Sequence, residues 1–481
     1  MKEIIITYCA LLSFLFGFSQ TPADIDTSFF YSGGVAPANS SINSIAIQLD
    51  GKILIGGSFN SYNGTAKQNV ARLNSDGSLD TSFLSTANNA SSTQGTVNSI
   101  EVLNNGTIIM GGKFTSVNTG ALRAYFAGLN SDGSISMTTY IDGLDNYVNC
   151  VAKNPNNNFY YIGGDFTHHI SDYHGISQFN DVINGSVKAM VVQTDGKVLF
   201  GGSFLSVGST TVNGFTRLNV DTLNGTYELA SVVTVDSTFN QGGAGVGAGS
   251  TINAIAIQSD GKILIAGTFG TYNGISRLGI ARLNTNGTLD TSFDPITGIN
   301  YNIYAIAVQT DGKILIGGMF TTYNGVSRKG IARLNSNGSL DTTFNPGLGM
   351  AGGNLLVKTI ALQTDGKIIV GGDFTSYNGV TRNGIVRLYG DSALGIENQN
   401  SKQLNLYPNP ANDKFTIDFG SQIISNYSIK INNLLGQEVY TAVIDKPQFE
   451  VYKTWQGQGL YFVKIYDVNN NLVTTRKIIL Q

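Results

Sequence analysis

Three histidines are the first side chains that could do chemistry, because imidazole binds metals and exchanges protons near neutral pH. They are His168, His169 and His174, and all lie in one short stretch. His168, Asp172 and His174 together could bind a divalent metal ion. Their spacing matches no established ligand motif, so the alternative is a variable surface turn. We predict that the protein uses no metal and no cofactor.

An oxygen-rich loop that recurs along the chain is a second candidate. The run NSDGSLD begins at Asn74, and close copies begin at Asn130, Asn284 and Asn335. Calcium sites need several carboxylates, but the central aspartate is asparagine in two copies, and Ser136 replaces the last aspartate in another. Asp-Gly and Asn-Gly are also common turn residues, so we predict turns rather than calcium loops.

Lysines and arginines also recur at fixed places, where they could line a ring and bind an anion. The alternative, which we favour, is that each solvates a turn or pairs with a neighbouring carboxylate. The lysines that follow Asp-Gly are Lys52, Lys197, Lys262, Lys313 and Lys367. The arginines are Arg72, Arg217, Arg282, Arg333 and Arg387.

Catalytic motifs are missing from the sequence, which has no G-x-S-x-G, HExxH, P-loop or Rossmann glycine pattern. Cys150 has no defined histidine partner, and we expect it to be a buried small residue. A site would need loops that depart from the repeats, as in the short third repeat and the insertion from Val220 to Ser250. We therefore predict that the protein is not an enzyme.

Residues 1–20 resemble a secretory signal peptide. Lys2 precedes an apolar run from Ile4 to Phe18, and small residues allow cleavage before Gln20 or Thr21. The run is too short for a membrane anchor, so we expect no transmembrane segment in the mature protein. The net charge of -3 gives no reason to expect nucleic acid as a partner.

Internal repetition dominates the rest of the chain and indicates an all-β fold. The run DGKILIGG occurs at Asp50 and Asp311, and seven copies or variants end at Gly57, Gly112, Gly164, Gly202, Gly267, Gly318 and Gly372. A good copy has four β-prone runs separated by Asp-Gly and Asn-Gly turns, which we expect to be type I′. The unit is therefore predicted to be a four-stranded antiparallel meander.

The first two runs of a repeat are apolar on both faces, which predicts sheets stacked face to face. Seven such units predict a seven-bladed β-propeller, with a β-solenoid as the alternative. The fourth-strand sequence DTSF also occurs at Asp26, before the first repeat, and the last repeat lacks it. We therefore expect the N-terminal segment to complete the last blade and close the ring.

The repeated DGK-apolar-GG, YNG, ARLN and DTSF elements resemble the delta-60 repeat family of secreted bacterial proteins. The resemblance places this repeat domain at residues 21–390. It is informative about the family and says little about function.

Beyond a polar linker at residues 391–403, a different pattern predicts a small immunoglobulin-like β-sandwich at residues 404–481. It resembles the type A C-terminal sorting domain of the type IX secretion system of Bacteroidetes. The matching residues are Tyr407, Pro408, Asn409, Pro410, Leu435, Gly436, Gly459, Leu460, Tyr461 and Lys477. The resemblance implies the type IX machinery as a partner and a destination at the cell surface or outside the cell.

The sequence thus predicts a secreted or cell-surface repeat scaffold with a binding or adhesion role, and a glycan or a protein as its ligand. Two alternatives stay open. One is a glycan-active lyase or hydrolase built on the propeller, and the other is a structural component of the cell surface.

Overall fold

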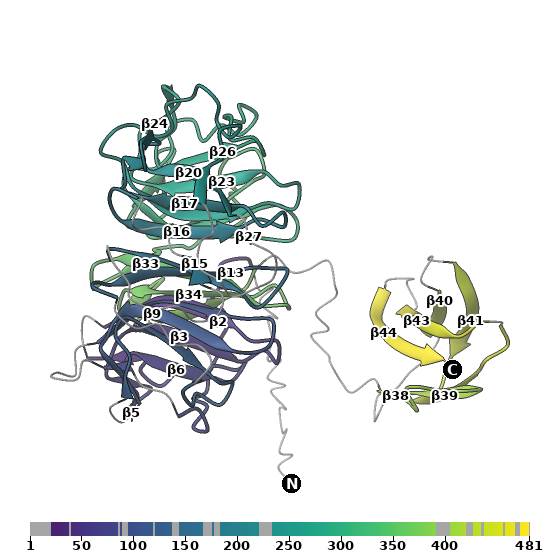
Figure 1. Cartoon of the computed structure of the whole chain (residues 1–481). Helices are drawn as coiled ribbons and strands as arrows, with labels where there is room; N and C mark the ends of the chain where they lie inside the picture. The colour runs from purple at the N-terminus through teal and green to yellow at the C-terminus, as the bar shows by residue number, and fades with distance from the viewer. Residues whose placement is uncertain are drawn as a thin grey trace, which may run out of the picture. The chain divides into compact units, whose positions relative to one another are not determined.

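The computed structural model of the 481-residue chain describes residues 21–37, 40–84, 87–88, 95–118, 121–136, 144–166, 176–177, 183–220, 233–390, 405–419, 427–433, 437–455, 457–466 and 472–480. The predicted signal peptide and linker lie outside them. The chain divides into two compact units, Met1–Gly390 and Asp391–Gln481 (Figure 1). Every regular element of the described residues is a β-strand, so the all-β prediction is confirmed.

One small sheet recurs through the first unit. A first strand pairs with a second, and a third strand extends the sheet from the second strand. Within the described ranges there are seven such sheets, which we number 1 to 7 in chain order.

The first strands are β2 (Ser41–Ile47), β8 (Thr96–Val102), β13 (Val148–Lys153), β16 (Val187–Val192), β22 (Ile252–Ile257), β27 (Ile303–Val308) and β33 (Leu356–Leu362). The second strands are β3 (Ile53–Ser58), β9 (Ile108–Lys113), β14 (Tyr160–Gly164), β17 (Val198–Gly202), β23 (Ile263–Gly267), β28 (Ile314–Gly318) and β34 (Ile368–Asp373). The third strands are β6 (Val70–Leu73), β12 (Phe126–Leu129), β15 (Ile176–Ser177), β20 (Phe215–Val220), β26 (Ile280–Leu283), β31 (Ile331–Leu334) and β37 (Ile385–Leu388).

Within the described residues, the fourth strand that we expected is formed only in sheet 4, by β21 (Val233–Val235). In sheet 6 the corresponding run makes a single bridge between Leu334 and Leu340, and sheets 1, 2 and 5 have the same arrangement. The prediction was wrong because the aspartate of DTSF caps a turn with its own side chain. Asp341 Oδ1 accepts hydrogen bonds from the backbone N–H and the hydroxyl of Thr343. Sheet 3 differs again, since β15 pairs with β14 in parallel.

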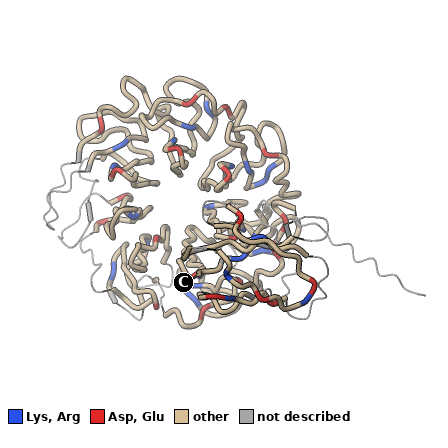
Figure 2. The backbone as a smooth tube through the Cα atoms, turned by 90° about the vertical axis from the view of Figure 1, so that its right-hand side faces the viewer, with Lys and Arg blue, Asp and Glu red and all other residues tan. Residues whose placement is uncertain are grey.

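The sheets form a ring, which Figure 2 shows along its axis. Each first strand contacts the first strand of the next sheet, and β33 contacts β2. The N-terminal segment completes sheet 7 as predicted, because Ile25 bridges Leu388 and the Asp26 amide donates to the Arg387 carbonyl. Both ends of the repeat domain therefore meet in one sheet.

The hydrophobic cores lie between neighbouring sheets, as the two-faced apolar strands predicted. One core combines Leu54 of sheet 1 with Val97 and Met110 of sheet 2. The Gly-Gly pair that ends each second strand allows a close approach. A Cβ atom on Gly57 would lie 1.9 Å from the Ser41 carbonyl oxygen, so no other residue fits there.

The two kinds of turn differ in backbone conformation. Asn324 and Gly325 have φ values of 49° and 77°, as a type I′ turn requires. Of the pairs at 311–312 and 337–338, only Gly312 and Gly338 have a positive φ, of 84° and 90°, so the type I′ prediction was wrong for these two turns. Asp311 instead accepts a hydrogen bond from the Lys313 amide, and the glycine takes the left-handed position alone.

The Asn-Gly turn also does not join the second strand directly to the third. It closes a short extra hairpin between them, which in several sheets is extended by the segment that enters the sheet. These small strands are β1 (Val35–Ala36), β4 (Ser61–Tyr62), β5 (Thr65–Ala66), β7 (Ala87–Asn88), β10 (Ser116–Val117), β11 (Ala121–Leu122), β18 (Ser206–Val207), β19 (Thr210–Thr211), β24 (Thr271–Tyr272), β25 (Ile275–Ser276), β29 (Thr322–Tyr323), β30 (Val326–Ser327), β32 (Met350–Ala351), β35 (Ser376–Tyr377) and β36 (Val380–Thr381).

The second unit has two antiparallel sheets that share one core. Their strand orders are β38-β39-β42 and β41-β40-β43-β44. The core combines Phe415 and Ile417 of the first sheet with Ile429 and Val463 of the second. The strands are β38 (Asn405–Tyr407), β39 (Lys414–Asp418), β40 (Tyr427–Asn432), β41 (Glu438–Ile444), β42 (Gln448–Tyr452), β43 (Gly459–Tyr466) and β44 (Leu472–Leu480).

Candidate functional site

The metal candidates His168, Asp172 and His174 lie outside the described residues. In the part of the chain that the structure describes, no group of three or more histidine, cysteine, aspartate or glutamate residues is placed to hold a metal ion. Cys150 is buried, as expected, with its thiol 3.7 Å from the Gly163 carbonyl oxygen. Burial raises the pKa of this thiol to about 12, so it is a poor nucleophile in the folded protein.

The oxygen-rich loops are turns, as predicted. Asp76 Oδ1 accepts hydrogen bonds from the Ser78 amide at 2.9 Å and from the Ser78 hydroxyl at 2.7 Å. Asn74 donates to the same hydroxyl at 2.9 Å. The last aspartate of the motif, Asp80, is bound to Arg72 at 2.8 Å. The oxygen atoms of the loop are therefore used within the protein.

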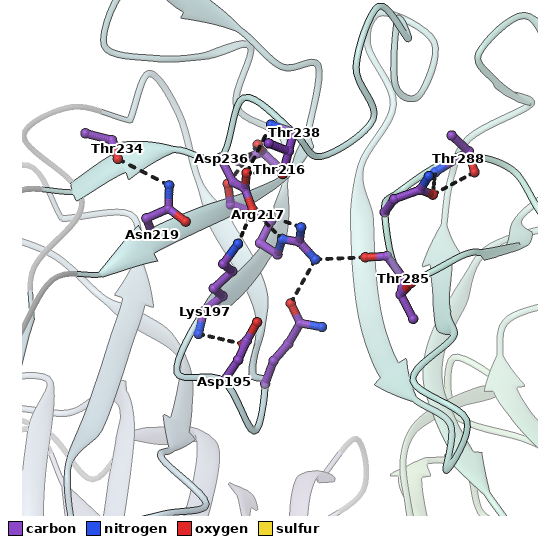
Figure 3. A network of polar contacts seen from close by, with 12 residues as sticks. Asp195, Lys197, Thr216, Arg217, Asn219, Thr234, Asp236, Thr238, Thr285 and Thr288 are labelled. Carbon is purple, nitrogen blue, oxygen red and sulfur yellow. Dashed lines mark hydrogen bonds and ion pairs between the residues drawn. The ribbon is translucent and has the colours of Figure 1, made fainter.

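The repeated lysines and arginines converge on one buried aspartate in each of five sheets, and Figure 3 shows the example in sheet 4. Lys197 Nζ lies 2.7 Å and Arg217 NH2 lies 2.9 Å from Asp236 Oδ2. Burial by itself raises the pKa of Asp236, but hydrogen bonds from Lys197 and Thr238 outweigh it and hold that pKa well below its usual range. The carboxylate stays ionised and pairs with both cations.

The same arginine also joins neighbouring sheets. Arg217 NH1 donates to the Thr285 carbonyl oxygen of sheet 5 at 2.8 Å, and its guanidinium lies 4.5 Å from the centre of the Phe239 ring. We call the aspartate with its arginine and lysine the ion cluster of its sheet. The ion clusters are Asp80–Arg72–Lys52, Asp236–Arg217–Lys197, Asp290–Arg282–Lys262, Asp341–Arg333–Lys313 and Asp26–Arg387–Lys367. The predicted pairing with carboxylates is thus confirmed.

Sheets 2 and 3 have no ion cluster among the described residues. In sheet 2 the three positions hold Thr107, Gly128 and Ser136, so all three members are replaced together. In sheet 3 the lysine position is Phe159. Among the described residues these two sheets therefore have no aspartate–arginine–lysine cluster, although Lys153 of sheet 3 pairs with Glu101 of sheet 2 and Lys188 of sheet 4 pairs with Asp165.

A second set of repeated positions differs in residue type from sheet to sheet. These positions lie at the rim where the first strands begin and the second strands end, which we call the start rim. In every first strand a β-bulge displaces one residue at this rim. A bulge redirects a side chain and is common next to functional sites. The seven residues, which we call the bulge ring, are Asn43, Asn98, Asn149, Lys188, Asn253, Tyr304 and Lys358.

Asparagines of the bulge ring connect first strands. Asn98 Nδ2 donates to the Val148 carbonyl oxygen of the next sheet at 3.0 Å. Asn43, Asn149 and Asn253 donate to the next sheet in the same way. These four residues therefore have a structural role in the ring.

The two lysines depart from this pattern. Lys188 Nζ lies 3.3 Å from Asp165, which also accepts hydrogen bonds from Asn149 and Ser186. Lys358 Nζ donates to Ser41 Oγ at 2.9 Å and to Asn43 Oδ1 at 2.8 Å. Burial lowers the pKa of Lys358, because a partly enclosed ammonium loses hydration.

Sequence reasoning did not find the bulge ring, because a bulge is invisible in a strand pattern. A signal was present, however. Asn253, Tyr304 and Lys358 occupy one position in three otherwise similar repeats. Because these repeats keep the same core residues and differ at this position, the position can take on a specific role in each sheet.

In the second unit the sorting-signal residues mostly lie on strands or at their ends. Tyr407 ends β38, and its hydroxyl donates to Asp418 at 3.2 Å. Pro408 and Pro410 follow cis peptide bonds, and Asn409 Oδ1 accepts from the Ile479 amide at 2.9 Å. Gly459, Leu460 and Tyr461 lie in β43 and Lys477 in β44, whereas Leu435 and Gly436 lie outside the described residues.

Comparison with protein families confirms both resemblances. Residues 48–83, 193–221, 258–293, 309–344 and 363–394 match the domain of unknown function DUF5122, a β-propeller. Residues 405–481 match the secretion system C-terminal sorting domain. No curated protein has a significant match to this chain.

Solved structures with a similar fold have low identity. PorZ, a surface component of the type IX secretion system of Porphyromonas gingivalis, is 15% identical, with a TM-score of 0.34, over 91% of this chain and 51% of PorZ. The chain thus spans about half the length of PorZ. A virginiamycin B lyase of Staphylococcus aureus is 12% identical, with a TM-score of 0.41, over 74% of this chain and 97% of the lyase. Both TM-scores are low, and neither structure bears on the function of this chain.

The sorting domain indicates export to the outer cell surface or the extracellular space, and it implies contact with the type IX machinery. Of the described residues, none belongs to a helix that is long and apolar enough to cross a membrane. The chain therefore combines repeats that match the DUF5122 β-propeller domain with a C-terminal segment that matches the sorting domain of a secretion system.

Proposed function

We propose that this protein is a non-enzymatic binding scaffold of the cell surface or the extracellular space, and that its ligand contacts the start rim. One observation carries the proposal. The residues of the ion clusters are the same in five sheets, whereas the residues of the bulge ring and its neighbours differ from sheet to sheet. Variable side chains on a rigid scaffold are where recognition concentrates.

The ionic groups of the start rim support binding rather than turnover. Asp165 is committed to Lys188 and to two further hydrogen bonds, from Asn149 and Ser186. A general acid or base needs a carboxylate that can exchange its proton during the reaction. The interactions of Asp165 instead outweigh its burial and hold its pKa below the usual value, so it stays ionised and suits an orienting role.

A glycan array probed with the mature full-length protein tests the proposal. We expect selective binding that weakens when Lys188→Met and Lys358→Met are combined, because methionine keeps the apolar stem and removes the charge. Leu49→Ala is the matched control, since Leu49 is 100% exposed at the opposite rim. Incubation with each bound glycan should leave its length unchanged.

Two results would overturn the proposal. Shortened or unsaturated products would indicate a lyase or hydrolase. A protein that binds no glycan and assembles with itself would indicate a structural surface component.

A further inference from the structure

Sheet 2 contains a backbone outlier at the start rim. In the six sheets where it is described, the residue before the third strand has a left-handed φ, and its carbonyl accepts a hydrogen bond from the end of the second strand. This residue is Gly214, Gly279, Gly330 or Gly384 in four sheets and Asn69 in sheet 1, residue types that tolerate the conformation. In sheet 2 it is Tyr125, with a φ of 67°.

A tyrosine in this conformation is costly. The left-handed region strains a residue with a Cβ atom, and such outliers cluster at functional sites. Nothing in the backbone hydrogen bonds requires the tyrosine, since glycine makes the same two bonds in sheets 5, 6 and 7. The side chain itself therefore needs an explanation.

The Tyr125 ring faces a second unusual residue of the rim. Its centre lies 5.5 Å from that of Tyr147, with the ring planes at 71°. Tyr147 directly precedes β13, where the other sheets have residues such as Ser186 and Thr251. Both tyrosines are half-buried, and within the described ranges neither hydroxyl has a hydrogen-bond partner.

A cation completes the group. Lys113, the last residue of β9, is exposed, and its Nζ lies 4.9 Å from the centre of the Tyr147 ring. The ion pairs between described residues that involve sheets 2 and 3 are Lys153–Glu101 and Lys188–Asp165, and neither includes this ammonium. An exposed cation–π contact is weaker than a hydrogen bond between oppositely charged groups. An incoming anion would therefore replace the Tyr147 ring as the partner of Lys113.

We infer that Lys113, Tyr125 and Tyr147 form a binding site for one anionic sugar unit, a pyranose that bears a carboxylate or a sulfate. The inference deepens the proposed function and rests on it. The lysine binds the acidic group, a tyrosine face packs against the C–H groups of the ring, and the free tyrosine hydroxyls bond to the sugar hydroxyls.

An acidic peptide fits the site less well. Peptides that bind to sheets usually add a strand to an open edge. The start rim presents the ends of β9 and β13 rather than an edge, so an acidic peptide would use Lys113 and little else.

The site also lies in the two sheets that depart from the regular repeat. Among the described residues, sheet 2 lacks an ion cluster, and so does sheet 3, which supplies Tyr147. The same two sheets carry the aromatic and cationic side chains of this group at the start rim.

The test uses the mature full-length protein and pairs of oligosaccharides that differ only in acidic groups, such as trigalacturonic acid and its methyl ester. Calorimetry should show at least tenfold tighter binding of the acidic member of a pair. Lys113→Gln and Tyr147→Ala should each weaken that binding about tenfold or more. The preference should decrease as salt is added, because the contact is ionic.

Tyr125→Gly separates a binding role from a packing role, because glycine is the residue of the equivalent position in four other sheets. We expect at least threefold weaker binding, with a melting temperature that is unchanged or higher. A lower melting temperature with unchanged affinity would overturn the assignment of Tyr125. Tyr125→Asn, which copies Asn69 of sheet 1, should behave like the glycine variant.

The failure of this inference differs from that of the proposed function. Equal binding of both members of every pair, or a polyglutamate peptide that competes equally, would overturn the anionic-sugar site. Binding that depends on Lys188 and Lys358 but not on Lys113 would also overturn it, while binding at the start rim would stand. Failure to bind any glycan would overturn both.

Discussion

Sheets 4–7 and sheets 2–3 are copies of one unit that differ in how they hold to their neighbours. Sheet 5 has the buried pair Arg282–Asp290, whose arginine also reaches the Ser336 carbonyl of sheet 6. Sheet 2 has Gly128 and Ser136 at the same two positions. In sheets 4–7 the repeated residues stabilise the ring, whereas in sheets 2–3 other residues occupy these positions and the surface at the start rim differs.

Removing residues 21–30 should have the largest effect. The deletion leaves Arg387 buried without Asp26, which costs about 3–5 kcal/mol. It also removes the buried ring of Phe29, worth a similar amount. Chemical denaturation should show a loss of at least about 5 kcal/mol, and an unchanged unfolding midpoint would argue against closure of the ring by this segment.

Single substitutions at one position of two sheets sharpen the comparison. Asp290→Asn should lower the free energy of unfolding by about 3–5 kcal/mol, because it leaves two cations facing a neutral side chain. Ser136→Ala, the equivalent change in sheet 2, should cost about 1 kcal/mol. Equal losses would show that the ion clusters do not set the regular sheets apart.

Acid should weaken the regular sheets first. Burial alone would raise the pKa of Asp341, but hydrogen bonds from Thr343 and the charge of Arg333 lower it to about 2. An unfolded aspartate has a pKa near 3.9, so the unfolded state binds more protons between these values, and stability is lost as the pH falls from about 4 to 2. Asp341→Asn should lose this part of the pH dependence, about 2–3 kcal/mol, and an unaltered acid transition would contradict the account.

Thiol labelling gives a smaller and more local test. Cys150 in sheet 3 is buried, so it reacts only when the sheet opens. The equivalent position in sheet 5 is Ala254, and Ala254→Cys in a Cys150→Ala background is the matched probe. We expect at least tenfold faster labelling at Cys150, because sheet 3 has no ion cluster among the described residues. Slower labelling there would reverse the comparison.

Much of the fold could be predicted from the sequence, because turn residues and two-faced strands are local signals. The DTSF run of residues 26–29 even indicated how the ring closes. The fourth strand was wrong because a side-chain capped turn at Asp341 has the same β-prone composition as a strand. The type I′ prediction failed at Asp311 because Asp-Gly serves two turn types equally well.

The candidate site was harder to predict, since it depends on contacts between repeats. Tyr125 and Tyr147 are 22 positions apart in the sequence, and only the ring brings them together with Lys113. The left-handed φ of Tyr125 also has no sequence signal apart from the glycine of the other repeats. Aligning the repeats position by position would have marked Tyr125 as an exception.

Two variants measured side by side test the central claim most directly, namely that regular sheets stabilise the ring and irregular sheets bind the ligand. Asp236→Asn and Tyr147→Ala would each be compared with the unmodified protein for melting temperature and for affinity toward the acidic oligosaccharide. The account predicts that Asp236→Asn lowers the melting temperature and keeps the affinity, whereas Tyr147→Ala keeps the melting temperature and lowers the affinity about tenfold. Tyr147→Ala protein that binds as tightly as the unmodified protein would contradict it.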